Sequence, residues 1–134
     1  MGMLAVAIAL GLATQSAGQE QSAPPAPFMV FFDWGKPDLR SDDRSVLDQV
    51  AAAYRGRPSA HLQIAGHSDR SGGAAVNRAA GLRRAQTVRG ELEKRGIPRN
   101  AMSIVSFGED RPLVPTEDGV REVQNRRVVI AFEE

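Results

Sequence analysis

The segment Leu62-Gln63-Ile64-Ala65-Gly66-His67-Ser68-Asp69 decides the fold, because it runs from an alternating apolar pattern directly into a polar turn. The alternation is typical of a half-buried strand, and the turn-forming pair Gly72-Gly73 follows soon afterwards. Asp69 is therefore expected at the exit of a strand. Further along the chain, Arg84 is expected in the first turn of a helix, where backbone N–H groups have no intrahelical partner.

Apolar patterns on both sides of this segment predict the remaining secondary structure. The expected strands are 28–32, 62–66, 102–105 and 128–132. A first helix is expected from Ser41 to Gly56, and a second from a cap at Gly81 to Gly96. A loop is expected over 71–80, and a short helical turn within 116–124.

The predicted order of elements is β-α-β-α-β-(α)-β. Two helices on one face of a mixed four-stranded sheet would bury both apolar stripes. The predicted fold class is therefore α+β, a two-layer sandwich. Strands joined through helices are expected to run parallel with right-handed crossovers, whereas the last connection is long enough to allow either sense.

Composition excludes several classes of protein. The 134 residues suffice for one domain with its own core. A net charge of +1 with 25% charged residues is balanced, unlike the clustered bases of a nucleic-acid-binding protein. Two histidines and no cysteine leave little for a transition-metal site, a thiol nucleophile, a disulfide or a lipid-modified N-terminal cysteine. We expect no metal, no cofactor and no nucleic-acid partner.

The N-terminal residues have a different character from the rest. Residues 4–13 are apolar and uncharged, and 14–18 are small and polar, which predicts a secretory signal peptide over 1–17. The alternative is a buried N-terminal helix. The apolar run is about half of the roughly 20 residues that span a bilayer, so a membrane-spanning helix is not expected. Residues 18–27 contain three prolines and are expected to form a linker, with the folded domain over 28–134.

Arg84 is a candidate anion-binding residue on the second predicted helix. The apolar positions expected to face inward are Leu82, Ala85, Val88 and Leu92. Arg84 lies at the flank of this stripe, whereas Arg83 lies nearly opposite and is expected in solvent. A carboxylate bound by Arg84 would also gain the free N–H groups of the helix start. The alternative is that Arg84 pairs with Asp69 or another acid, which would contribute only about 0.2–1 kcal/mol.

Further polar residues are expected near Asp69. Asp69 is either a turn former or an acceptor for a bound ammonium, and with Arg84 it could hold a zwitterion. Asp33 would lie at the same end of a parallel sheet, Asn77 could donate and accept from the loop, and Arg126 could line the same cleft. His67 has no flanking nucleophile motif, so we expect a packed histidine and no catalytic residue.

These motifs together resemble the OmpA-like C-terminal domain family. The matching stretches are Gly66-His67-Ser68-Asp69, Asn77, Arg84-Ala85, Phe107-Gly108-Glu109 with Pro112, and Asn125-Arg126-Arg127-Val128. They occur in the order of the family and extend the resemblance over roughly 29–132. Gly81 stands where the family commonly has a serine that caps the helix.

The resemblance implies a periplasmic domain that binds peptidoglycan non-covalently by recognising the diaminopimelate of its stem peptide. It assigns the ligand-binding aspartate and arginine of the family to Asp69 and Arg84, its loop asparagine to Asn77, and its arginine before the last strand to Arg126.

The expected protein is therefore a small, secreted, non-enzymatic binder associated with the cell wall or outer membrane. Its expected partners are peptidoglycan and other envelope proteins. Two alternatives remain open, namely an envelope adaptor that no longer binds the wall and a hydrolase acting on peptidoglycan.

Overall fold

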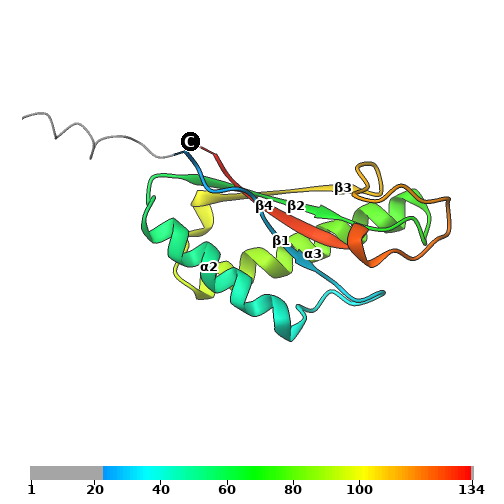
Figure 1. Cartoon of the computed structure of the whole chain (residues 1–134), viewed down its shortest axis with the longest axis horizontal. Helices are drawn as coiled ribbons and strands as arrows, with labels where there is room; N and C mark the ends of the chain where they lie inside the picture. Colours follow the sequence, from blue (N-terminus) through cyan, green and yellow to red (C-terminus); the bar gives the residue numbers. More distant parts are fainter. Residues whose placement is uncertain (1–22, 134) are drawn as a thin grey trace, which may run out of the picture.

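The computed structural model describes residues 23–133, which form a sheet of four strands and two α-helices (Figure 1). The elements follow in the order β1 (Phe28–Phe31), α2 (Arg44–Arg55), β2 (His61–His67), α3 (Ala74–Lys94), β3 (Met102–Gly108) and β4 (Arg127–Glu133). Short 3-10 turns cover Ser41–Asp43, Arg99–Ala101 and Val123–Asn125. The predicted signal peptide over 1–17 lies outside the described residues, and residues 23–27 of the predicted linker belong to no helix or strand.

The strand order in the sheet is β1-β4-β2-β3. β2 and β3 are parallel, and β4 lies between β1 and β2 and is antiparallel to both. Both helices lie on the same side of the sheet (Figure 1). The predicted two-layer α+β sandwich with a mixed sheet is therefore confirmed, and the last connection takes the antiparallel sense.

This topology brings three chain segments together at one end of the strands. β1 and β2 both end there, and β4 begins there, because β4 runs antiparallel to its two neighbours. The core beneath the sheet is apolar. Its fully buried side chains include Val30, Phe32, Leu47, Leu62, Ile64, Leu92, Val128 and Ile130. Among the residues that the structure describes, neither helix has the length and apolar character needed to cross a membrane.

The predicted start of the second helix is wrong. α3 begins at Ala74, with Gly73 in an extended conformation at its N-cap, so the residues expected as a loop form its first two turns. Alanine is the strongest helix former, and four alanines between 74 and 80 favour this earlier start. Gly81 lies inside the helix, and Leu82, expected in the core, has 39% of its surface exposed.

Gly81 serves a packing role instead of a capping role. A Cβ built on Gly66 would overlap the backbone carbonyl oxygen of Gly81, and a Cβ built on Gly81 would overlap the Ser106 hydroxyl. β2 and α3 therefore touch backbone to backbone, which only glycine permits. Since Arg84 follows Gly81 by about one helical turn, this contact places its side chain at the end of β2.

We expect Gly66→Ala to lower the free energy of unfolding by at least about 3 kcal/mol, because backbone atoms cannot move aside as a side chain can. Gly90→Ala in α3 is the matched control. A Cβ on Gly90 meets no atom within 4 Å, so this change should stabilise the protein by about 0.5–1 kcal/mol. Urea unfolding followed by circular dichroism measures both, and equal effects of the two substitutions would contradict the close approach of β2 and α3.

Candidate functional site

Asp69 follows β2 directly, and only 3% of its surface is exposed. Its Oδ1 accepts hydrogen bonds from the backbone N–H and the hydroxyl of Ser71, at 3.2 and 2.6 Å. Its Oδ2 accepts from Arg126 Nη1 at 2.7 Å and from the backbone N–H of Glu122 at 3.1 Å. A carboxylate offers about four acceptor positions, so the described residues occupy all of them.

These hydrogen bonds keep Asp69 ionised. Burial alone would raise the pKa of Asp69, but hydrogen bonds from Ser71, Arg126 and Glu122 outweigh it and lower the pKa below its ordinary value. Arg126 also donates from Nε to the backbone oxygen of Phe32 at 2.9 Å. The Asp69–Arg126 ion pair therefore joins the end of β2 to the residues just before β4 and just after β1.

Arg84 lies in the middle of α3, so its predicted place in the first helical turn is wrong. Only 4% of its surface is exposed. Its Nη1 donates to the backbone oxygen of His67 at 3.2 Å, and its guanidinium carbon lies 5.6 Å from the centroid of the Phe32 ring. Among the described residues, no carboxylate forms an ion pair with Arg84, because Asp69 pairs with Arg126 instead.

The charge of Arg84 is consequently uncompensated. Burial, followed by the nearby charge of Arg126, lowers the pKa of Arg84 to about 10, while Asp69 opposes this shift. The guanidinium is still protonated at neutral pH. A buried charge without a partner is unfavourable, and an anion placed beside it would relieve that cost.

Asn77 lies in the first turn of α3 and is also buried. Both hydrogens of its amide nitrogen are used, since Nδ2 donates to the backbone oxygen of Gly72 at 2.7 Å and to Glu109 Oε1 at 2.6 Å. Within the part of the chain described by the structure, no donor reaches Asn77 Oδ1. That oxygen is therefore open to a ligand.

A pocket of about 160 Å³ brings three of the five predicted site residues together, namely Asp69, Asn77 and Arg84. The other residues that line it are Trp34, Gly35, Ser68, Ser71, Gly72, Val76, Ala80 and Arg83. Arg126 lies behind Asp69 and supports it without lining the pocket. Asp33 lies at the same end of the sheet, as expected, but it is exposed and does not line the pocket.

Among the lining residues that the sequence did not identify as candidates, Trp34 and Ser71 form a hydrogen-bonded pair. Trp34 Nε1 donates to the Ser71 hydroxyl at 3.0 Å, and the guanidinium carbon of Arg121 lies 3.4 Å from the centroid of the Trp34 ring. The only tryptophan of the chain stands in a polar loop beside Asp33, which is a signal that could have pointed to Trp34. Ser71 follows Asp69 by two residues, the spacing at which an aspartate commonly bonds the backbone.

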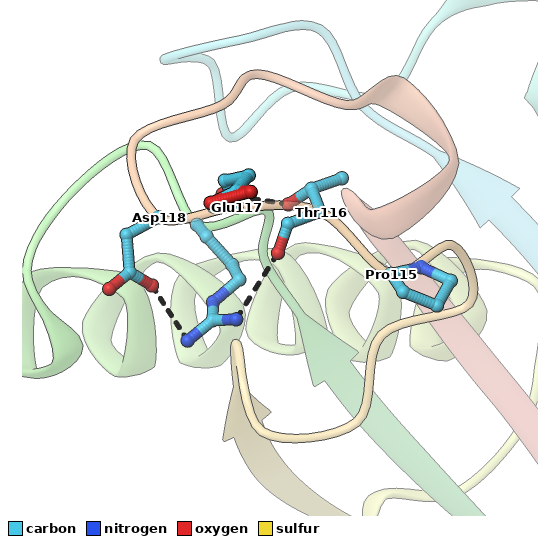
Figure 2. Close-up of a pocket in the computed structure, with 5 residues that line it drawn as sticks. Pro115, Thr116, Glu117 and Asp118 are labelled. Carbon is cyan, nitrogen blue, oxygen red and sulfur yellow. Dashed lines mark hydrogen bonds and ion pairs between the residues drawn. The ribbon is translucent and has the colours of Figure 1, made fainter.

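The loop between β3 and β4 is held over the site by Arg70. Arg70 pairs through Nη2 with Asp118 Oδ1 at 2.7 Å and donates through Nη1 to the backbone oxygen of Thr116 at 3.3 Å (Figure 2). Its own backbone oxygen accepts from the N–H of Gly119 at 2.7 Å. A shallow hollow of about 510 Å³ beside these residues is lined by 115–118 and Arg70. The same loop supplies the backbone N–H of Glu122 to Asp69, so Arg70 fixes one side of the site.

His67 is a packed histidine, as expected. It is buried, and its ring centroid lies 5.5 Å from that of Phe107. Burial, with the charges of Arg127 and Arg111, lowers the pKa of His67 to about 4, so its imidazole is neutral at neutral pH. Its backbone oxygen holds Arg84. Across residues 23–133, no group of three or more histidines and acids is placed to hold a metal ion.

A model of the OmpA family matches residues 31–126. An outer membrane protein of Gluconacetobacter diazotrophicus is 38% identical over 113 residues, which are 80% of this chain and 30% of that protein. A peptidoglycan-associated lipoprotein of Rhizobium meliloti is 36% identical over 100 residues, which are 75% of this chain and 57% of the relative. The chain thus spans 30% of the length of the first relative and 57% of the length of the second.

Solved structures share the fold. The peptidoglycan-associated lipoprotein of Burkholderia pseudomallei aligns with a TM-score of 0.74 at 29% identity, over 79% of this chain and 90% of that one. The C-terminal domain of Helicobacter pylori MotB aligns with a TM-score of 0.70 over 82% of this chain and 85% of that one. Its identity of 22% supports a common fold alone.

The low pKa of His67 predicts a loss of stability in mild acid. Between about pH 6.5 and 4, the imidazole takes up a proton in the unfolded chain but not in the folded one, so protonation favours unfolding. We expect the free energy of unfolding to fall by about 3 kcal/mol between pH 7 and pH 4 from this group. His67→Gln should remove most of this dependence in urea titrations at several pH values.

His61→Gln is the control, because His61 lies at the opposite end of β2. It should leave the pH dependence in place. An unchanged pH dependence in His67→Gln would show that His67 is protonated without cost in the folded protein.

Proposed function

The chain belongs to the OmpA family, and from this membership we propose that it binds peptidoglycan non-covalently through the diaminopimelate of the stem peptide. The observation that supports this most is the buried guanidinium of Arg84, which lacks a carboxylate partner among residues 23–133 and lines a pocket beside the ionised Asp69. Such a pocket suits a ligand that carries a carboxylate and an ammonium on one carbon.

The free end of diaminopimelate has this chemistry. Its carboxylate would receive charge-assisted hydrogen bonds from Arg84, whose exposed neighbour Arg83 adds positive charge at the rim. Its ammonium would lie in the negative field of Asp69 and within reach of the open Asn77 Oδ1. A stem peptide with lysine in this position has the amine but not the carboxylate, so Arg84 would favour the diaminopimelate type.

The relatives support an association with the cell wall. Proteins of Rhizobium meliloti and Burkholderia pseudomallei that resemble this chain are named peptidoglycan-associated lipoproteins. The chain is accordingly a protein of the cell envelope, at the periplasmic or outer-membrane side. The signal peptide over 1–17, the linker over 18–27 and contacts with other envelope proteins are parts of the same proposal.

No catalytic step is part of this function. The names of these relatives describe association with peptidoglycan or the outer membrane. Two charged groups of the pocket are held in fixed hydrogen bonds, because the acceptor positions of Asp69 are all occupied and Arg84 donates to the backbone oxygen of His67. Such an arrangement suits a site that binds and releases its ligand without converting it chemically.

Co-sedimentation with purified sacculi tests the proposal. The wild-type protein should pellet with diaminopimelate-type sacculi and remain in the supernatant with lysine-type sacculi. Arg84→Met should lower the affinity for the diaminopimelate type by about tenfold to a hundredfold, the loss expected for charge-assisted hydrogen bonds. Because Arg84→Met removes an uncompensated buried charge, its free energy of unfolding should stay equal to that of the wild type or rise.

Arg89→Met is the matched control, since Arg89 lies on α3 outside the pocket, and it should pellet as the wild type does. Equal binding to both types of sacculi would overturn the role of diaminopimelate and leave a coarser affinity for peptidoglycan. A wild-type protein that pellets with neither would overturn wall binding and favour an adaptor of the envelope.

A further inference from the structure

The carboxylate of Asp69 has no free position for a new donor. Each of its oxygens already accepts two hydrogen bonds, from Ser71 on one side and from Arg126 and Glu122 on the other. A bound ammonium could reach Asp69 only by displacing one of these donors. Another group, hydrogen-bonded to Asp69, must therefore accept the hydrogen bond of the ammonium.

The Ser71 hydroxyl lies in the position that such an acceptor requires. It lines the pocket, donates to Asp69 Oδ1 at 2.6 Å and accepts from Trp34 Nε1 at 3.0 Å. A hydroxyl has one hydrogen and two lone pairs, so one lone pair remains unused. We propose that Ser71 Oγ, oriented by Trp34 and Asp69, is the direct acceptor for the ammonium of the bound ligand, an inference that rests on the proposed recognition of diaminopimelate.

Trp34 fixes the direction of the Ser71 hydroxyl. An indole N–H can only donate, so the hydrogen of Ser71 Oγ cannot point at Trp34 and instead points at Asp69. The ring is itself held in place by the guanidinium of Arg121, which lies 3.4 Å from its centroid. Trp34 is thus a positioning residue that keeps an acceptor lone pair available in the pocket.

Asn77 provides a second acceptor from a different element. Its Oδ1 receives no hydrogen bond from residues 23–133, and it belongs to α3, whereas Ser71 belongs to the loop after β2. Gly72 lies between them, and a Cβ on Gly72 would come within 3.0 Å of Asn77 Oδ1. The missing side chain of Gly72 keeps this oxygen accessible, so an ammonium can donate to Ser71 and Asn77 together.

A matched pair of peptides tests the role of Ser71. The first is L-Ala-γ-D-Glu-meso-diaminopimelate, and the second carries 2-aminopimelate in its place and so lacks only the distal amine. Calorimetry on the full chain should give a preference of the wild type for the first peptide of at least about tenfold. Ser71→Ala should reduce this preference below about threefold, because Asp69 Oδ1 lies 2.6 Å behind the lost hydroxyl. Ser71→Thr, which keeps the hydroxyl, should retain it.

Trp34→Phe separates positioning from packing. Phenylalanine keeps an aromatic face for Arg121 but removes the N–H donor. We expect the diaminopimelate peptide to lose about threefold to tenfold more affinity than the 2-aminopimelate peptide. A purely structural role of Trp34 would weaken both peptides equally. Because Trp34 is the only tryptophan, the fluorescence of the wild type should also change on binding.

The outcomes distinguish the two proposals. A wild type that binds neither peptide overturns the proposed function and the role of Ser71 with it. A wild type that prefers diaminopimelate, with a folded Ser71→Ala variant that keeps the full preference, overturns the role of Ser71 alone and leaves the function standing. Circular dichroism of each variant establishes that it is folded.

Discussion

The buried ion pair between Asp69 and Arg126 is the interaction on which the site depends. Its 2.7 Å contact joins the end of β2 to the residue before β4, and Arg126 extends the link to the backbone of Phe32 after β1. The backbone of Glu122 adds the loop between β3 and β4. Loss of either partner would leave a buried charge uncompensated, at a cost of about 3–5 kcal/mol. Three segments that are distant in the sequence therefore meet around one carboxylate, namely the end of β1, the end of β2 and the connection from β3 to β4.

This pair also bears on the proposed ligand of the pocket. Because Asp69 is paired with Arg126, Arg84 has no ion-pair partner among the described residues, and an anionic group of a ligand would stabilise its charge. The close contact of Gly66 with Gly81 brings that guanidinium to the end of β2. Among the described residues, Asp69 is thus fully hydrogen-bonded, Arg126 is its buried partner, and Arg84 forms no ion pair. In the proposed function, acceptors such as Asn77 Oδ1 would receive the ammonium of the ligand.

The sequence predicted the strands, the order of elements along the chain and the place of Asp69, because alternating apolar runs and turn residues are local signals. The order of the strands within the sheet was not predicted, since it depends on contacts between distant segments. The predicted start of α3 was wrong because Gly81 resembles a helix cap when only its neighbours in the sequence are considered. The close approach of β2 explains why a glycine lies inside the helix. Arg84 was predicted as a binding residue, and it lines the pocket although its expected helical position was wrong. Trp34 and Ser71 were missed because their hydrogen bond spans 37 residues and arises from tertiary packing alone.

A crystal structure of the protein with L-Ala-γ-D-Glu-meso-diaminopimelate tests the account most directly. The predicted result places the distal carboxylate of diaminopimelate on the guanidinium of Arg84, with the Asp69–Arg126 pair intact behind it. The apolar groove between α3 and the edge strand β3, lined by residues such as Leu82 and Ile104, is a larger hollow that could also hold a peptide. A peptide bound there, or a carboxylate bound away from Arg84, would contradict the account.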